Sequence, residues 1–244
     1  MSDKKTAIVT GASQGIGAGL VEAFLKEGYS VVAMSRNLSQ SLVTSDMTGS
    51  PSLVLVDGDI AKQGTAAKTV DAAIKNFGTV EVLVNNAGIS SAPSPLRTSL
   101  PTTAIVLFST NLLGFIYITQ LTVKQMLKQK SGNVVSITAA LADQLIAGIN
   151  ASVSRITKGG LNSVTRSLTV EYAKAGIRFN AVAPGVGDTP LHKDAPQDSV
   201  KARQPMGKIA EVRDLVDAVL YLVQASQVTG EVLHVDGGVH AGCR

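Results

Sequence analysis

Short runs of β-branched and other apolar residues recur along the chain, separated by longer stretches with helical periodicity. The runs occupy residues 7–9, 30–34, 53–56, 82–84, 133–137, 178–182 and 232–235. Continuous apolar runs of this length are typical of strands buried on both faces of a sheet. The pattern therefore predicts a parallel sheet of about seven strands.

Three of the stretches between the runs repeat apolar residues every three or four positions, as an amphipathic helix does. They cover residues 16–24, 161–172 and 212–223, and the first two are followed by glycines that can end a helix, Gly28 and Gly176. Alternating strands and helices imply right-handed crossovers with helices on both faces of the sheet. We expect a single α/β domain over residues 1–244, with a Rossmann-like doubly wound parallel sheet.

Two segments interrupt this alternation. Residues 37–51 are rich in Ser and Thr and are expected to form an exposed loop. Residues 184–208 contain four prolines. Because a long irregular segment inside a compact domain is often functional, we predict a substrate lid around residues 186–205. The alternative is an irregular excursion on the surface.

Composition narrows the class of protein. The 244 residues are 45% hydrophobic and 16% charged, which excludes a mostly disordered chain. The net charge of +4 comes from scattered basic residues without interleaved aromatics, so nucleic-acid binding is not expected. Cys243 is the only cysteine, which fits a reducing compartment. No signal core or membrane-spanning apolar run is evident, so we expect a cytoplasmic protein that makes no membrane contact.

A glycine-rich turn joins the first predicted strand to the first predicted helix. Glycines let the backbone approach a pyrophosphate closely, and the N-terminus of the following helix offers free N–H groups to the anion. The predicted phosphate-binding residues are Gly11, Ser13, Gln14, Gly15, Ile16 and Gly17. The alternative is a structural turn without a ligand.

The glycine spacing Gly-x-x-x-Gly-x-Gly resembles that of the short-chain dehydrogenase/reductase family, and further motifs follow in that family's order. They are Asn85-Asn86-Ala87-Gly88, Asn111, Pro184-Gly185, Thr189 and Val235-Asp236-Gly237-Gly238. The resemblance implies a nicotinamide cofactor. It also implies that this cofactor is bound in part by Asn86, Ala87, Gly88, Pro184, Gly185 and Thr189.

The end of the second predicted strand indicates which dinucleotide binds. In NAD-binding folds an acidic residue about 20 positions after the glycines contacts the ribose 2′-hydroxyl. Here that strand ends in Ser35 and Arg36, whose planar cation suits a 2′-phosphate. We therefore predict NADP(H), the alternative being that Arg36 is an ordinary surface residue. Asp59 resembles the family's adenine-contacting aspartate, and Ile60 would flank the ring.

The resemblance departs from the family at the proton-transfer residues. In the family a tyrosine exchanges the substrate proton, and a lysine four residues later lowers the tyrosine pKa. Lys158 matches that lysine, but Ser154 stands four residues before it. No shift of the alignment restores a tyrosine, because none lies between Tyr117 and Tyr172. Ala139 falls at the position of the family's serine.

The resemblance leaves Asn111 and Lys158 as catalytic candidates. We expect Ser154 to hold a water that Lys158 polarises, and Thr138 or Ser136 to orient the substrate. The other possible replacements are more often loop or cap residues: Asp143, Gln144, Asn150, Ser152 and His192. His234 and His240 show no metal-ligand spacing, so no metal is expected.

Three functions remain open from the sequence. The first is an NADP(H)-dependent reductase of a carbonyl, imine or activated double bond with a non-standard proton path. The second is an NADP(H)-binding protein without redox activity, and the third is a lyase or isomerase that reuses the pocket. We favour the reductase, because the predicted cofactor residues are nearly complete. Since the family commonly forms tetramers through two long helices, here residues 102–129 and 155–174, we expect a homotetramer, the alternative being a homodimer.

Overall fold

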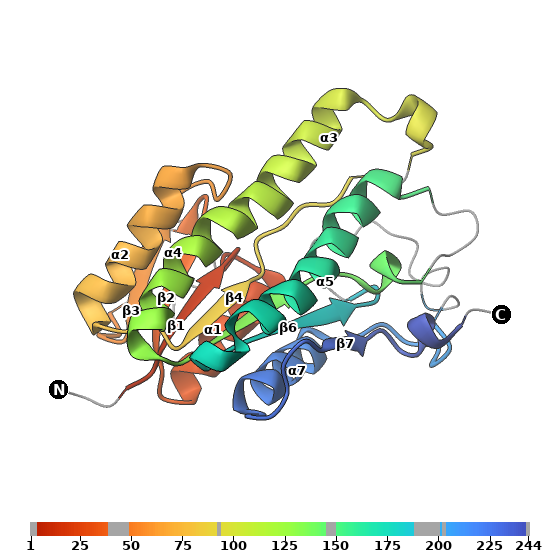
Figure 1. Ribbon diagram of the computed structural model, residues 1–244. Coiled ribbons are helices and arrows are strands. Elements are labelled where there is room, and N and C mark those ends of the chain that lie inside the picture. The colour runs from red at the N-terminus through yellow and green to blue at the C-terminus, as the bar shows by residue number, and fades with distance from the viewer. Residues whose placement is uncertain are drawn as a thin grey trace.

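Seven parallel strands form one sheet in the computed structural model, in the order β3-β2-β1-β4-β5-β6-β7 (Figure 1). The strands are β1 Thr6–Thr10, β2 Ser30–Ser35, β3 Leu53–Asp57, β4 Val82–Asn85, β5 Gly132–Ile137, β6 Ile177–Pro184 and β7 Val232–Val235. The structure describes residues 4–38, 49–91, 94–144, 150–187, 201 and 204–242. The chain winds outward from β1 to β3 and returns to β4 beside β1, which confirms the doubly wound fold.

Helices cover both faces of the sheet. The longer ones are α1 Gly15–Lys26, α2 Gln63–Phe77, α3 Pro101–Phe108, α4 Gly114–Gln129, α5 Ser152–Tyr172 and α7 Val212–Gln224. Short helical turns are η3 Leu96–Thr98, η4 Ser109–Leu113, η5 Ala140–Ala142, η6 Ala173–Ala175 and η7 Val239–Ala241. The predicted helices 16–24, 161–172 and 212–223 lie within α1, α5 and α7.

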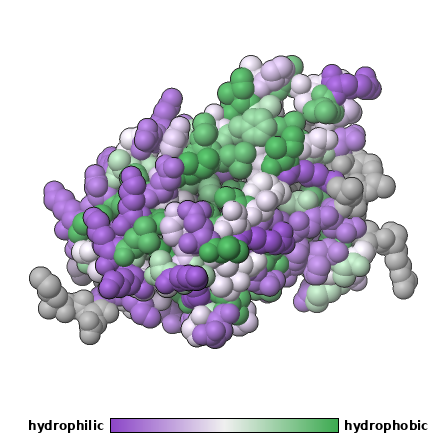
Figure 2. Space-filling model, in the orientation of Figure 1, coloured by the Kyte–Doolittle hydropathy of each residue, from purple (hydrophilic) through white to green (hydrophobic). Residues whose placement is uncertain are grey.

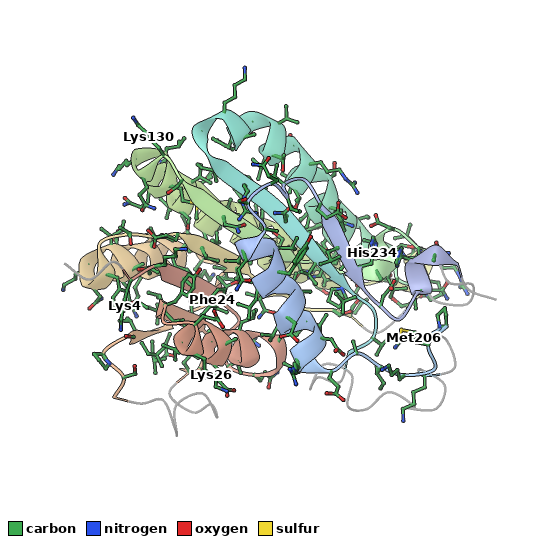
Figure 3. All side chains as sticks on the ribbon, turned by 90° about the horizontal axis from the view of Figure 1, so that it is seen from below. Lys4, Phe24, Lys26, Lys130, Met206 and His234 are labelled. Carbon is green, nitrogen blue, oxygen red and sulfur yellow. The ribbon has the colours of Figure 1, made fainter. Side chains whose placement is uncertain are left out.

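Two apolar cores lie on either side of the sheet. On one face, α1 and α7 pack side by side, and Phe24 is fully buried between α1 and the sheet (Figure 3). On the other face, α2 and α4 bury Val70, Ile118 and Met126 against the strands. The period that predicted α1 also gives the side that this helix buries, which includes Leu20 and Phe24. Gly28, with φ of +82°, follows the end of α1 as expected.

One helical segment corrects the expectation of no membrane-length run. Together α3, η4 and α4 form a continuous helix of 29 residues, Pro101–Gln129, that is apolar and long enough to cross a membrane by length and composition only. A long helix over residues 102–129 was expected, but Thr, Ser and Gln interrupt its apolar residues, so the sequence showed no continuous apolar run. The segment contributes Ile118 and Met126 to the core, and its outer side bears exposed apolar side chains (Figure 2).

The two interrupting segments fall largely outside the described residues. Of the first, residues 39–48 are not described, and neither are residues 188–200, 202 and 203 of the predicted lid. Leu38 departs from the exposed loop that was expected, because its side chain is fully buried in the core beneath α1 and α7. Its backbone N–H donates to Asp57 Oδ1 at 2.8 Å.

Candidate active site

The glycine turn lies at the carboxyl ends of β1 and β4, where the strand order reverses. Gly11 and Gly15 have φ of +66° and +54°, which favours glycine at both positions. A Cβ at Gly11 would lie 2.8 Å from Ala87 Cα, and one at Gly17 would lie 2.6 Å from Asn86 Nδ2 and clash with Gly11 O. The turn is therefore packed against the loop after β4 without room for side chains.

The N-terminus of α1 opens directly from this turn. Its N-cap residue, Gln14, makes no side-chain cap hydrogen bond, and the first turn of the helix contains no acidic residue. The first N–H groups of a helix have no partner within it and carry the positive end of its dipole. A phosphate fits this arrangement, so the residues here suit the pyrophosphate of a dinucleotide.

A hydrogen-bond network ties the loop after β4 to the glycine turn. Thr10 Oγ1 accepts from the backbone N–H groups of Asn86 and Ala87, both at 3.0 Å, and donates to Val84 O. Asn86 Nδ2 donates to Thr10 O at 2.9 Å and to Gly11 O at 3.0 Å. Thr10 was not among the residues predicted from the sequence, although it directly precedes the first glycine.

The end of β2 lies beside the same turn. Ser35 Oγ donates to Ser13 Oγ at 3.0 Å, which brings two predicted cofactor residues together. Arg36 is exposed just beyond them. Asp57 is paired with Ser35 in the sheet register, but its Oδ1 already accepts the Leu38 N–H. Arg36 is thus an exposed cation beside the Ser35–Ser13 pair.

The predicted adenine contacts lie in the turn after β3. Asp59 is exposed, and its Oδ1 accepts from Ala61 N at 3.0 Å, so it stabilises its own turn. Ile60 is only 5% exposed and packs so closely on Gly114 that a Cβ there would lie 2.9 Å from Ile60 Cγ2. Little of the Ile60 side chain is open to a ligand in this arrangement.

Asn111 lies in a single π-helical turn, η4, between α3 and α4. Its side chain is 3% exposed; Nδ2 donates to Ile89 O at 3.0 Å and Oδ1 accepts from Ile89 N at 2.9 Å. Nδ2 also donates to Thr157 Oγ1 at 3.2 Å. π-Turns inside α-helices are frequent at functional sites. Here the turn links the loop after β4 to α5.

Lys158 reaches the end of β5 from α5. Its Nζ donates to Ile137 O at 2.9 Å, and a Cβ at Gly88 would lie 3.1 Å from Nζ and 3.4 Å from Asn111 Oδ1. Burial lowers the pKa of Lys158 to about 8, because the charged ammonium loses hydration. An amine with this pKa can exchange a proton near neutral pH.

Two serine hydroxyls face each other next to this lysine. Ser154 Oγ, one turn before Lys158, lies 3.5 Å from Ser91 Oγ in the loop after β4. The sequence reasoning missed Ser91, since it lies 63 positions away and outside any motif. Thr138 is only 4% exposed and its Oγ1 donates to Val182 O at 3.3 Å. That hydroxyl is therefore already used to join β5 to β6.

The predicted nicotinamide contacts after β6 are described only in part. Pro184 ends β6, and Gly185 N donates to Val235 O at 3.0 Å. A Cβ at Gly185 would lie 2.8 Å from Asp236 Cα, so this glycine allows a close approach to the turn after β7. Thr189 and His192 lie outside the described residues.

The structure brings together two histidines that the sequence did not connect. The rings of His234, labelled in Figure 3, and His240 stack with centroids 4.1 Å apart. His240 Nδ1 lies 3.0 Å from Asp236 Oδ1, and His234 Nε2 lies 3.3 Å from Asp143 Oδ2. Burial disfavours the Asp236 carboxylate, but hydrogen bonds from His240 and Gly238 outweigh it and lower the pKa of Asp236. No group of three or more His, Cys, Asp or Glu suited to a metal occurs in the described part of the chain.

Comparison with known proteins places this geometry in a family. A family model described as enoyl-(acyl carrier protein) reductase matches residues 11–240. The chain belongs to the short-chain dehydrogenase/reductase family. A 3-oxoacyl-[acyl-carrier-protein] reductase of Bos taurus is 34% identical over 235 residues, covering 96% of this chain and 98% of the relative.

Solved structures of family members extend the likeness to three dimensions. A 3-ketoacyl-(acyl-carrier-protein) reductase from Brucella melitensis, complexed with NADH, has a TM-score of 0.90 at 30% identity and covers 97% of this chain and 98% of its own. A structure of ElxO with NADP bound has a TM-score of 0.90 at 29% identity, covering 98% of this chain and 100% of its own. The protein is thus an NAD(P)-dependent oxidoreductase of the short-chain dehydrogenase/reductase family, as the sequence predicted.

Proposed function

We propose that the protein is an NADP(H)-dependent reductase of a carbonyl, imine or activated double bond, and that its proton does not come from a tyrosine. The observation that carries the proposal is the half-buried Lys158 beside Asn111 and the Ser154–Ser91 hydroxyl pair, at the carboxyl ends of β4 and β5. When bound, the reduced nicotinamide supplies the hydride. The residues of this chain then need to hold the substrate oxygen and deliver one proton.

Lys158 is the proton source in this proposal. With a pKa of about 8, its ammonium is charged at neutral pH yet acidic enough to give a proton to a developing alkoxide or amine. One N–H is directed to Ile137 O, which leaves two for the substrate side. Ser154 and Ser91 hold the substrate oxygen or a bridging water. Asn111 acts by fixing Ile89 and Thr157 around them.

The preference for NADP(H) follows from the end of β2. Arg36 is exposed next to the Ser35–Ser13 pair, and Asp57 is turned toward Leu38 N. We expect Arg36→Ala to weaken NADPH binding about tenfold or more, as loss of a charged hydrogen bond does, and to leave NADH binding unchanged. Titration of both dinucleotides measures this, and an unchanged ratio contradicts the assignment.

NADPH oxidation with a panel of ketones, aldehydes, cyclic imines and activated alkenes tests the reductase activity. We expect turnover with at least one class, and a rate that falls as pH rises above about 8 because Lys158 loses its proton. Ser154→Tyr, alone or with Ala139→Ser, should raise reduction of ordinary ketones. Binding of NADPH without turnover across the panel, or no response to either substitution, contradicts the proposal.

We also propose that two helices form contacts with further copies of the chain in a homotetramer. The long helix Pro101–Gln129 exposes Ile105 and Val106, and α5 exposes Ile156 and Val170, which is 83% exposed. Figure 2 shows apolar side chains gathered over α3, on the face where α5 also lies. Light scattering should give a tetramer that Val170→Asp disrupts; a monomeric wild type contradicts this proposal.

A further inference from the structure

Arg155, in the first turn of α5, has two guanidinium nitrogens that are shielded from solvent and unpaired. Neither Nε nor Nη2 has a hydrogen-bond partner among the described residues. Removing a cation from water without pairing it costs free energy, so buried charges are normally paired. None of the described residues supplies the partner that these two donors need.

The two unpaired nitrogens belong to one edge of the guanidinium. The N–H of Nε and one N–H of Nη2 point in the same direction, and this fork matches the two oxygens of a carboxylate. A neutral oxygen would satisfy only one of the two donors. A carboxylate, with two oxygens in one plane, would satisfy both donors at once.

Arg155 lies beside Lys158 on α5, because residues three apart in a helix are neighbours on its surface. Lys158 Nζ contacts the carbonyl of Ile137, the last residue of β5. Arg155 is three residues nearer the start of α5, so a rise of about 1.5 Å per residue places it about 4.5 Å beyond that level. Ligands of doubly wound folds bind beyond the carboxyl ends of the strands. Ser154, its neighbour, faces Ser91.

The nearest acidic residue in the sequence is engaged elsewhere. Asp143 is the only Asp or Glu between residues 139 and 155. Its Oδ2 accepts from Asn162 Nδ2 at 2.9 Å and lies 3.3 Å from His234 Nε2. Asn162 follows Arg155 by two helical turns on the same face of α5, so Asp143 lies further along the helix. It leaves the Arg155 fork unpaired.

The start of α5 adds to the positive potential around Arg155. The N-cap residue Ala151 makes no side-chain cap hydrogen bond, and the first turn contains no acidic residue. The positive end of the helix dipole therefore acts in the same region as the guanidinium. Together with the cationic Lys158 one turn away, these groups favour an anion.

We infer that Arg155 recognises a carboxylate on the substrate, so that the enzyme acts on oxo acids or the corresponding hydroxy acids. The inference rests on the proposed function, because it assigns the substrate class of the same site. The Arg155 fork would hold the carboxylate at one end of the substrate, while Ser154, Ser91 and Lys158 hold the reacting oxygen at the other.

Binding to the NADP+-saturated protein tests this without requiring turnover. The probes are 4-oxopentanoate and 4-oxocyclohexanecarboxylate, each compared with its primary amide by calorimetry. We expect at least one acid to bind tenfold or more tightly than its amide, as for a charge-assisted hydrogen-bond pair. Arg155→Gln should abolish the preference for the acid. Arg155→Lys keeps the charge but not the fork, so it should retain part of this preference. Arg166→Gln removes an exposed charge from the same helix and should change nothing.

Thermal unfolding separates recognition from a structural role. Without ligand, Arg155→Met should unfold at the same or a higher temperature than the wild type, because two shielded donors without a partner are removed. A clear fall in the unfolding temperature of Arg155→Met overturns the inference. So does a result in which neither acid binds more tightly than its amide, or one in which the preference for the acid survives Arg155→Gln. A protein that reduces neutral ketones but shows no acid preference overturns only the inference. One that prefers acids but oxidises no NADPH overturns only the proposed reductase activity.

Discussion

The glycine turn and the Lys158 cluster lie at the same edge of the sheet but are built from different kinds of atoms. At the turn, backbone groups and their close packing make the binding surface, with Thr10 and Asn86 bonded to the backbone. At the cluster, side-chain groups of Lys158, Ser154 and Ser91 carry the chemistry. A surface made of backbone tolerates little change in volume, whereas a cluster of side chains can exchange its chemistry residue by residue. Changes at the turn should therefore have larger effects than single changes at the cluster.

The largest expected effect is that of Gly17→Val. Its Cβ would clash with Gly11 O and lie 2.6 Å from Asn86 Nδ2, so the turn must move away from the position that receives the pyrophosphate. Overpacking of this kind costs about 3 kcal/mol, which is about a hundredfold in NADPH affinity. The measurement is NADPH titration by fluorescence. Gly64→Ala in α2 is the control, since a Cβ there meets nothing within 4 Å. The NADPH affinity of this variant should equal that of the wild type.

Thr10→Val tests the network that holds the turn to the loop after β4. Valine has nearly the same shape but no acceptor, so the N–H groups of Asn86 and Ala87 lose their shared partner in the buried interior. We expect the free energy of unfolding to fall by about 2 kcal/mol. Urea denaturation measures this. Thr10→Ser keeps the oxygen and should recover most of the loss; if serine is as destabilising as valine, the hydroxyl is not the stabilising group.

The same contrast explains what the sequence could and could not predict. Local patterns gave the strands to within one or two residues; the run 7–9, for example, lies inside β1 Thr6–Thr10. The glycine turn was predictable because its conformation demands glycine at fixed positions, and Gly11 has φ of +66°. The Ser91–Ser154 pair and the orphaned nitrogens of Arg155 were not, because they depend on how distant segments are placed in space.

Lys158 should make the stability of the ligand-free protein depend on alkaline pH. Burial lowers its pKa to about 8 from an ordinary 10.5, so between these values the unfolded chain binds a proton that the folded chain has lost. Unfolding then takes up protons, and the free energy of unfolding rises with pH over this window. Denaturation at about pH 8, 9 and 10, all within this window, should show the rise relative to Lys158→Met. If the two proteins have parallel profiles, the Lys158 amine is not perturbed by burial.

The smallest expected effect is that of Ser91→Ala. The hydroxyl lies 3.5 Å from Ser154 Oγ, at the long limit of a hydrogen bond, and both side chains are only half-buried. Removing one of two hydroxyls that share a substrate oxygen or water should cost about 1 kcal/mol, which is about fivefold in kcat. Because both hydroxyls serve the same oxygen, the double substitution Ser91→Ala with Ser154→Ala should cost a different amount from the sum of the two single ones. Single-turnover NADPH oxidation by the four proteins measures this coupling. Strict additivity would show that Ser91 and Ser154 act separately, and the proton path would then depend on Lys158 with only one of them.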